Sequence, residues 1–277
     1  SKGLNTSAIL GFCNSLLEVV NKFDPSHLAV VFDPPGGSDR EGVFADYKAN
    51  RQEMPEGIRN AIPYIFELLK AMNIRIEMEQ GYEADDVIGT LAKQAEKKGY
   101  KTYMMTSDKD FAQLVSDNIF MYRPGNKWQP TSVWGMPGVL EKFNVSRVDQ
   151  VIDFLAMMGD AADNIPGLPG VGQKTAQKFL KEYDSLEGLF ANSHELKGKM
   201  KENVESSKEI GLLCKRLVTI ITDVPVKMDE GRLKYEPIDS KKLTDLFEEL
   251  EFRTLLQRML SKNPNLKTNK SEAVSEN

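Results

Sequence analysis

The sequence has little of what builds disulfide frameworks, nitrogen and sulfur metal clusters or membrane spans. Its 277 residues include only two cysteines and two histidines. Cys13 and Cys214 each lie in an apolar helical pattern, which argues against a disulfide framework and favours a reducing compartment. No apolar run approaches the roughly 20 residues that cross a bilayer. The N-terminal stretch also lacks the basic start and cleavage site of a secretory signal, so we expect a cytoplasmic protein without a membrane partner.

Apolar strands that alternate with amphipathic helices predict an α/β core whose mostly parallel sheet is flanked by helices. The predicted strands cover 27–33, 74–79 and 100–108. A predicted helix at 4–20 precedes the first strand, and predicted helices at 57–72 and 84–99 lie between the strands. After about residue 135 the strand pattern disappears, and the predicted helices cover 146–158, 173–182, 185–191 and 200–220. We therefore predict a core over 1–134, a helical subdomain over 135–260 and a linker or disordered tail over 261–277.

Acidic residues follow the predicted strands at the points where each strand ends. They are Asp33; Glu83, Asp85 and Asp86; and Asp108 and Asp110. Since the carboxyl ends of parallel strands share one edge of a sheet, these side chains should converge there. Carboxylates without histidine or cysteine suit hard divalent cations such as Mg2+ or Mn2+, and a pair of such ions promotes in-line attack on a phosphodiester.

Each acidic cluster also has a simpler interpretation. EADD at a helix start can be a favourable dipole interaction, DKD can be a turn, and DAADN around Asp160 and Asp163 can be a loop after a helix. Three clusters at one sheet edge favour the metal site, because independent capping would rarely arrange them so. The net charge of -5 argues against a nucleic-acid partner when taken alone. Without the eight named acids, however, the net charge would change from -5 to +3, so the rest of the chain is mildly basic.

The segment NIPGLPGVGQKTAQKFL, residues 164–180, allows two interpretations. A phosphate loop of a nucleotide hydrolase needs Gly-Lys-Ser/Thr after a strand. Here Gln173 displaces Lys174, Pro169 removes an amide donor, and the preceding segment is helical. A helix-hairpin-helix fits better: its glycines, Gly167, Gly170 and Gly172, allow close approach to a DNA phosphate. The amides at the start of the second helix, with Lys174 and Thr175, attract it.

Several segments together resemble the 5′-nuclease (flap endonuclease) domain at the N-terminus of bacterial DNA polymerase I. They are VVFD, YKANR, EADDVIGTLA, SDKDFAQLV, MGDAADNIPGLPGVGQKTA and TDV, in the family's order, and the similarity extends from about 4 to 260. The resemblance implies a PIN-like nuclease fold that holds two or three Mg2+ or Mn2+ ions. It also implies cleavage of DNA flaps, 5′ ends and RNA primers during replication and repair, next to a polymerase chain that follows the tail.

The resemblance further implies roles for individual residues. It places Asp160 and Asp163 with the six acids above as metal ligands, and it casts the charged stretch 35–55 as a flexible arch for single-stranded DNA. Arg40, Lys48 and Arg51 match basic residues of that arch, and Tyr47 is a candidate for base stacking. Lys48 and Arg51, with Asp108 and Asp110, are the expected catalytic residues. The resemblance also implies a monovalent cation at the hairpin and a nucleoid-associated location. Its expected partners are branched or 5′-ended DNA and RNA–DNA primer junctions.

The sequence departs from that family at its start, where members have an apolar strand that ends in Asp. We therefore expect a truncated chain with a weakened metal site and reduced turnover. Two other functions stay open: a DNA-binding module without catalysis, and a related RNA-processing nuclease. The hairpin at 164–180 argues against the second, since such nucleases usually lack it.

Overall fold

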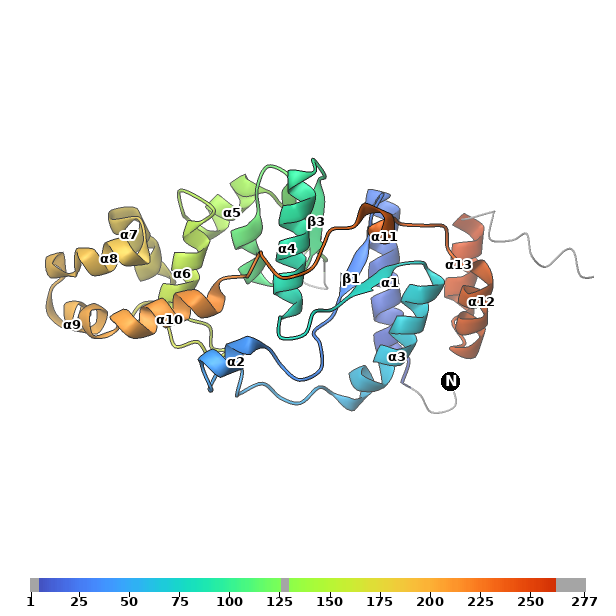
Figure 1. Ribbon diagram of the computed structural model, residues 1–277, viewed down its shortest axis with the longest axis horizontal. Helices are drawn as coiled ribbons and strands as arrows, with labels where there is room; N and C mark the ends of the chain where they lie inside the picture. The colour runs from blue at the N-terminus through green and yellow to red at the C-terminus, as the bar shows by residue number, and fades with distance from the viewer. Residues whose placement is uncertain (1–4, 126–129, 263–277) are drawn as a thin grey trace, which may run out of the picture. The chain divides into compact units, whose positions relative to one another are not determined.

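The computed structural model describes residues 5–125 and 130–262 and divides into two compact units (Figure 1). The first unit joins three stretches: up to Val30, Glu53–Glu77, and from Asp229 on. The second unit joins Val31–Gln52 with Met78–Met228. All residues expected to bind metal or DNA belong to the second unit.

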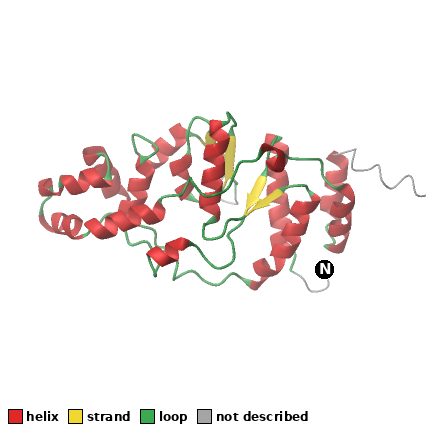
Figure 2. Ribbon diagram, in the orientation of Figure 1, coloured by secondary structure: helices red, strands yellow, loops and turns green. Residues whose placement is uncertain are grey.

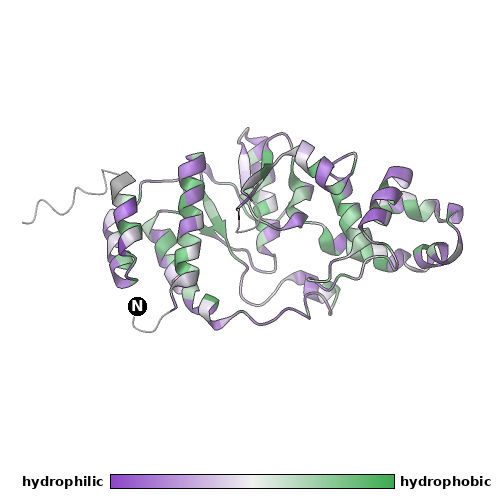
Figure 3. Ribbon diagram, turned by 180° about the vertical axis from the view of Figure 1, so that it is seen from behind, coloured by the Kyte–Doolittle hydropathy of each residue, from purple (hydrophilic) through white to green (hydrophobic). Residues whose placement is uncertain are grey.

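The first unit is a helical layer beside a small sheet. Its helices are α1 (Ser7–Phe23), α3 (Glu56–Ala71), α11 (Glu230–Leu233), α12 (Ser240–Glu249) and α13 (Arg253–Lys262). Its two strands, β1 (Ala29–Val31) and β2 (Arg75–Glu77), pair with each other. The residues that α1 buries, Ile9, Cys13, Leu16 and Leu17, recur three or four apart and form one face, which packs against α3. Figure 3 shows this division of α1 and α3 into hydrophobic and hydrophilic faces.

The second unit contains a three-stranded sheet next to one helix. β3 (Thr102–Met105) pairs in parallel with β4 (Ile119–Arg123), which pairs in antiparallel with β5 (Ser132–Trp134). α4 (Ala84–Lys97) packs against β3 and β4, and the short helix η1 (Lys109–Leu114) follows β3 directly. This arrangement places the start of α4 and the start of η1 where they can carry side chains into one site.

Helices make up the rest of the second unit, as Figure 2 shows. They are α2 (Asp39–Val43), α5 (Met136–Phe143), α6 (Gln150–Met158), α7 (Gln173–Tyr183), α8 (Leu186–Ala191), η2 (Ser193–Glu195), α9 (Gly198–Ser206) and α10 (Lys208–Val218). α6 is central, because it contacts α7, α8, α10 and η1. Its buried Phe154 and Leu155 belong to the same hydrophobic core as Met104 of β3 and Met121 of β4.

The predicted α/β core followed by a helical subdomain is confirmed, and the expected parallel pairing is found between β3 and β4. The expected sheet is not continuous, however. The strands form two sheets, and β4 and β5 were not predicted. The predicted helix 200–220 is interrupted at Ser207, whose amide bonds back to Val204 O at 3.2 Å. The tail predicted for 261–277 lies outside the described residues from 263 onward. Within the described ranges, we find no helix with the length and apolar character of a bilayer span.

Candidate metal centre and nucleic-acid interface

The first turn of α4 brings Asp33 next to the acids of EADD. Asp33 Oδ1 accepts a hydrogen bond of 2.8 Å from the amide of Ala84. Glu83 is the N-cap of α4, and its side chain exchanges hydrogen bonds with Asp86 in a capping box. Carboxylates from two distant segments thus meet at one helix N-terminus, where the helix dipole favours negative charge.

Asp85 lies within this cluster and is strongly perturbed by it. Burial raises the pKa of Asp85 to about 7, and the negative charges of Asp108 and Glu83 raise it further. Asp33 adds to this repulsion, and Lys48 opposes it. The acids after the three predicted strands therefore lie within electrostatic reach of one another, although β1 and β3 belong to different sheets.

Asp110 extends the cluster toward the loop after α6. Burial raises the pKa of Asp110 to about 7, and repulsion by Asp108, followed by that of Asp160 and Asp163, adds to the effect. Asp110 Oδ1 is buried and has no hydrogen-bond partner. Asp108 is fixed as the N-cap of η1, because its Oδ1 accepts a bond of 2.9 Å from the amide of Asp110. The site therefore holds a buried carboxylate oxygen that no protein donor satisfies.

Lys109 binds the carboxylate that faces Asp110. Its Nζ forms an ion pair with Asp160 Oδ2 and lies 3.8 Å from Asp110 Oδ1. Burial opposes the charge of Asp160, but the hydrogen bonds from Lys109 and from the amide of Ala162 outweigh it, and the pKa of Asp160 is lowered. Lys109 was not among the residues predicted from the sequence. Its position between Asp108 and Asp110 was the one sequence feature that could have indicated a role at this site.

The loop that carries Asp160 and Asp163 is a tight reversal between α6 and the hairpin. Asp160 and Ile165 exchange two backbone hydrogen bonds of 2.8 Å. Gly159 (φ 73) and Gly167 (φ 68) face each other so closely that a Cβ on Gly159 would lie 2.5 Å from Ile165 O. A Cβ on Gly167 would lie 2.6 Å from Gly159 N. Glycine is thus required at both positions to hold the two acids in place.

Replacing Gly159 or Gly167 by alanine should lower the free energy of unfolding by more than about 2 kcal/mol, through backbone strain and overlap. Gly172 offers a matched control, because it has φ -103 and a Cβ there would meet nothing within 4 Å. The Gly172→Ala variant should stay within about 0.5 kcal/mol of the wild type in urea unfolding. Equal losses at all three positions would contradict this account of the loop.

The segment 44–51, at the base of the expected arch, lies against the acidic cluster. Lys48 Nζ is 2.7 Å from Glu83 Oε1, and Arg51 Nη2 is 2.6 Å from Asp163 Oδ1. The amide of Lys48 also donates to Asp163 O at 3.0 Å. The two cations expected to be catalytic therefore neutralise two of the expected metal ligands.

Two other expected DNA contacts do not fit their positions. Arg40 is buried, and its guanidinium donates to both oxygens of Asp86 at 2.5 and 2.7 Å and to the carbonyls of Leu217 and Thr219. Asp86 is fully buried and also accepts from the amides of Glu83 and Ile221. With these bonds the Asp86 carboxylate has no oxygen left for a metal. The dipole and capping interpretation of EADD thus holds for Asp86, and Arg40 is a structural cation.

Tyr47 is also enclosed, with 5% of its surface exposed. Its hydroxyl donates to Glu83 Oε2 at 3.2 Å, and Lys48 Nζ lies 4.8 Å from its ring centre. The ring therefore has no open face for stacking on a base in this arrangement, contrary to the expectation. Burial raises the pKa of the Tyr47 hydroxyl, which keeps it a neutral donor.

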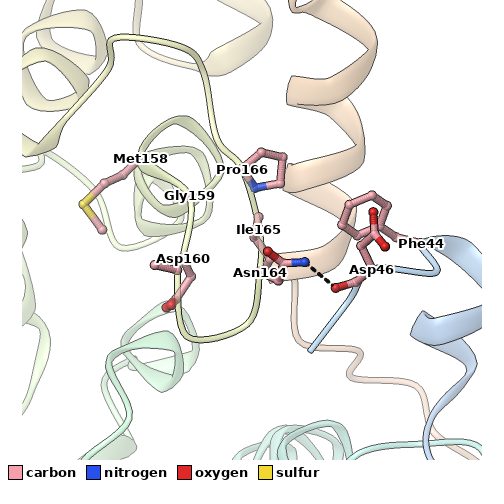
Figure 4. A pocket seen from close by; sticks show the side chains of 9 residues that line it. Phe44, Asp46, Met158, Gly159, Asp160, Asn164, Ile165 and Pro166 are labelled. Atoms are coloured by element: carbon pink, nitrogen blue, oxygen red, sulfur yellow. Dashed lines mark hydrogen bonds between the residues drawn. The ribbon is translucent and has the colours of Figure 1, made fainter. Parts of the chain in front are cut away.

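An open pocket of about 470 Å3 lies between Phe44, Asp46 and the loop 158–166. Figure 4 shows Asn164 reaching from this loop to Asp46, where its Nδ2 donates to the backbone carbonyl at 2.7 Å. Asn164 adopts a left-handed backbone (φ 58), which asparagine tolerates better than most residues. This contact fastens the loop of Asp160 and Asp163 to the base of the expected arch.

The segment 164–180 forms a hairpin between α6 and α7, as predicted, and the element directly before it is the helix α6 rather than a strand. Leu168 and Val171 are buried and anchor the turn, and the amide of Leu168 donates to Met157 O at 2.9 Å. Gly172, Gln173 and Lys174 are exposed at the start of α7. The structure thus presents free helix N-terminal amides at an open glycine, the arrangement that suits a phosphate.

The residues fit a divalent cation by their chemistry. Burial first, and then repulsion by Asp108, raises the pKa values of Asp85 and Asp110, and Asp110 Oδ1 has no hydrogen-bond partner. A bound cation would relieve both costs. In the described part of the chain, no three His, Cys, Asp or Glu side chains are already grouped closely enough to hold an ion.

Comparison with known proteins places the chain in one family. Residues 1–144 match the family model of the 5'-3' exonuclease N-terminal resolvase-like domain, and residues 146–241 match that of the 5'-3' exonuclease C-terminal SAM fold. The 5'-3' exonuclease of Aquifex aeolicus is 39% identical over 259 residues, which cover 94% of this chain and 87% of that protein. DNA polymerase I of Bacillus subtilis is 40% identical over 260 residues, which cover 93% of this chain. The match covers 29% of the length of that polymerase.

Solved structures share the fold at lower identity. A zinc-bound T5 5'-exonuclease superimposes with a TM-score of 0.66 and 21% identity, covering 89% of this chain and 93% of that one. The catalytic core of Rad2 in complex with DNA substrate gives a TM-score of 0.62 and 15% identity, covering 94% and 87%. These structures share the fold, and the family models with the Aquifex aeolicus relative show that the chain belongs to the 5'-3' exonuclease family.

Proposed function

We propose that this 5'-3' exonuclease hydrolyses phosphodiester bonds in DNA flaps, in 5′ ends and in RNA primers at RNA–DNA junctions, with Mg2+ or Mn2+ as cofactor. The carboxylate cluster of the second unit carries this proposal, because four separate segments supply acids that repel one another. The T5 D15 flap endonuclease has been solved with DNA and metal ions, and Rad2 with DNA substrate. The relatives named DNA polymerase I support work beside a DNA polymerase. Action during replication and repair, in the cytoplasm at the nucleoid, is part of the same proposal.

The proposed metal ligands are seven of the eight expected acids, for two or three ions. They are Asp33, Glu83, Asp85, Asp108, Asp110, Asp160 and Asp163. Asp86 is left out because protein donors already use its oxygens. When bound, divalent cations activate water and stabilise negative charge on phosphate oxygens.

The cations of the segment 44–51 have a second task in this proposal. Lys48 and Arg51 form ion pairs with Glu83 and Asp163. Arg51 is half exposed, so its guanidinium can turn toward a phosphate without a large desolvation cost. We assign both side chains to binding the phosphate next to the bond that is cut, where they would hold the DNA strand against the acids.

The hairpin positions the duplex in this proposal. Lys174 and Thr175 lie in the first turn of α7, next to the open Gly172. Phosphate contacts there fix the register of the DNA without selecting a sequence. The carbonyls of the turn also give a monovalent cation a place beside the phosphate.

The function is tested with a labelled 5′-flap substrate in Mg2+ and in EDTA. Cleavage that needs Mg2+ and releases 5′ products supports the nuclease, and an RNA-primed substrate run beside it tests the junction. Flap binding without cleavage would instead support the DNA-binding module. The observation that favours this alternative is that basic side chains already pair with Glu83, Asp160 and Asp163. Selective cleavage of structured RNA would support the RNA-processing alternative.

Replacing Lys174 by glutamine should weaken duplex binding uniformly across sequences and reduce the salt dependence of log Kd by about one unit. Lys241 on α12 is an exposed lysine that provides a control for net charge. Fluorescence anisotropy over a series of KCl concentrations measures both effects. An unchanged salt dependence for Lys174→Gln would remove α7 from the proposed DNA interface.

A further inference from the structure

Lys109 is a cation carried by the DKD segment itself, and it pairs with an acid of DAAD. It is the first residue of η1, yet its side chain extends to the loop after α6 and pairs with Asp160. The same Nζ lies 3.8 Å from Asp110 Oδ1, an oxygen that has no hydrogen-bond partner. One ammonium therefore lies within ion-pair distance of both the Asp110 and the Asp160 carboxylates.

Lys109 differs from Lys48 and Arg51 in the element that carries it. The other two belong to the segment 44–51, outside any helix or strand. η1 is anchored by Phe111, Ala112 and Leu114, which are buried in the core and pack toward α6 and α4. Lys109 thus stays at the cluster whatever the segment 44–51 does, and only its side chain is free to move.

The Lys109 side chain is exposed enough to move away from Asp160 into solvent. It is 40% exposed, whereas the carboxylate of Asp160 is 16% exposed. A lysine ammonium on a flexible stem exchanges partners at low cost when water can replace them. A divalent cation at Asp110 and Asp160 would repel this ammonium and would take over both carboxylates.

We propose that Lys109 is a built-in counter-ion that competes with the divalent cation for Asp110 and Asp160, so that metal binds only as its ammonium withdraws. This inference rests on the proposed function, since it concerns the same metal site. Lys109 stabilises the metal-free fold by screening the repulsion between the acids. It weakens metal affinity by the same contact, because the ion must displace it.

The test measures Mn2+ affinity by calorimetry and the melting temperature in EDTA. Lys109→Met should bind Mn2+ roughly tenfold more tightly than the wild type and should melt at a lower temperature without metal. Lys109→Gln is the second neutral variant, used if Lys109→Met fails to fold. Lys109→Arg keeps the charge and should retain the wild-type affinity. Lys101→Met, at an exposed position before β3, controls for loss of one surface charge.

The outcomes separate this inference from the function beneath it. Mn2+ that binds the wild type and both neutral variants with equal affinity would overturn the role of Lys109 and leave the metal site intact. Weaker binding by Lys109→Gln would also overturn it, because the lysine would then assist the ion. Absence of Mn2+ binding by the wild type and every variant would overturn both proposals.

Discussion

Replacing Asp110 by asparagine should give a metal-free protein that is more stable than the wild type, but should reduce Mg2+-dependent cleavage more than about 100-fold. The pKa of Asp110 is raised from 3.8 to about 7 in the fold, so the metal-free fold favours the protonated carboxyl. The stability that this proton contributes is fully present below pH about 4 and is lost as the pH rises through about 7. Asparagine stays neutral, so the gain of about 1–3 kcal/mol should appear at pH 8 in EDTA and vanish near pH 4.

Asp117→Asn is the matched control for this experiment. Asp117 is exposed and lies just before β4, away from the acidic cluster. Its replacement by asparagine therefore removes one negative charge without changing that cluster. It should change neither thermal stability in EDTA nor cleavage of a labelled flap. A loss of stability for Asp110→Asn at pH 8 would mean that the Asp110 carboxylate is well compensated without metal, against the geometry described above.

Replacing Arg40 by methionine should lower the free energy of unfolding by about 3–5 kcal/mol, because it leaves the fully buried Asp86 without its cation. It also removes the donors to the carbonyls of Leu217 and Thr219, where α10 ends. Urea unfolding at neutral pH, followed by circular dichroism, measures the loss. A second replacement, Asp86→Leu, removes the stranded carboxylate and should restore part of the stability.

Arg51→Met provides the comparison for that variant. Arg51 also pairs with an aspartate, but 54% of its side chain is exposed, so the pair should contribute less than about 1 kcal/mol. Similar losses for Arg40→Met and Arg51→Met would show that burial does not distinguish the two ion pairs. The contrast tests our assignment of Arg40 to the structure and of Arg51 to the DNA interface.

The local pattern was enough to anticipate the acidic cluster, since Asp33, Asp85 and Asp108 each follow an apolar run that forms a strand. Convergence did not require the single sheet that we expected. β1 and β3 lie in different sheets, and the acids still meet because the first turn of α4 binds Asp33 directly. Strands β4 and β5 escaped prediction because short apolar segments such as IFMYR carry no distinctive periodicity.

The sequence by itself determined the chemistry: many carboxylates with almost no histidine or cysteine, and a glycine-rich turn between two helices. These features depend on residue type and on spacing along the chain, which sequence records directly. Tertiary structure alone decided which charges serve the fold and which stay available. Arg40 and Arg51 lie eleven positions apart in one charged stretch, yet one is buried against Asp86 and the other is open to solvent. The difference comes from burial and from the acidic partner, which lies 46 residues away along the chain for Arg40 and 112 residues away for Arg51. No local sequence pattern encodes either property.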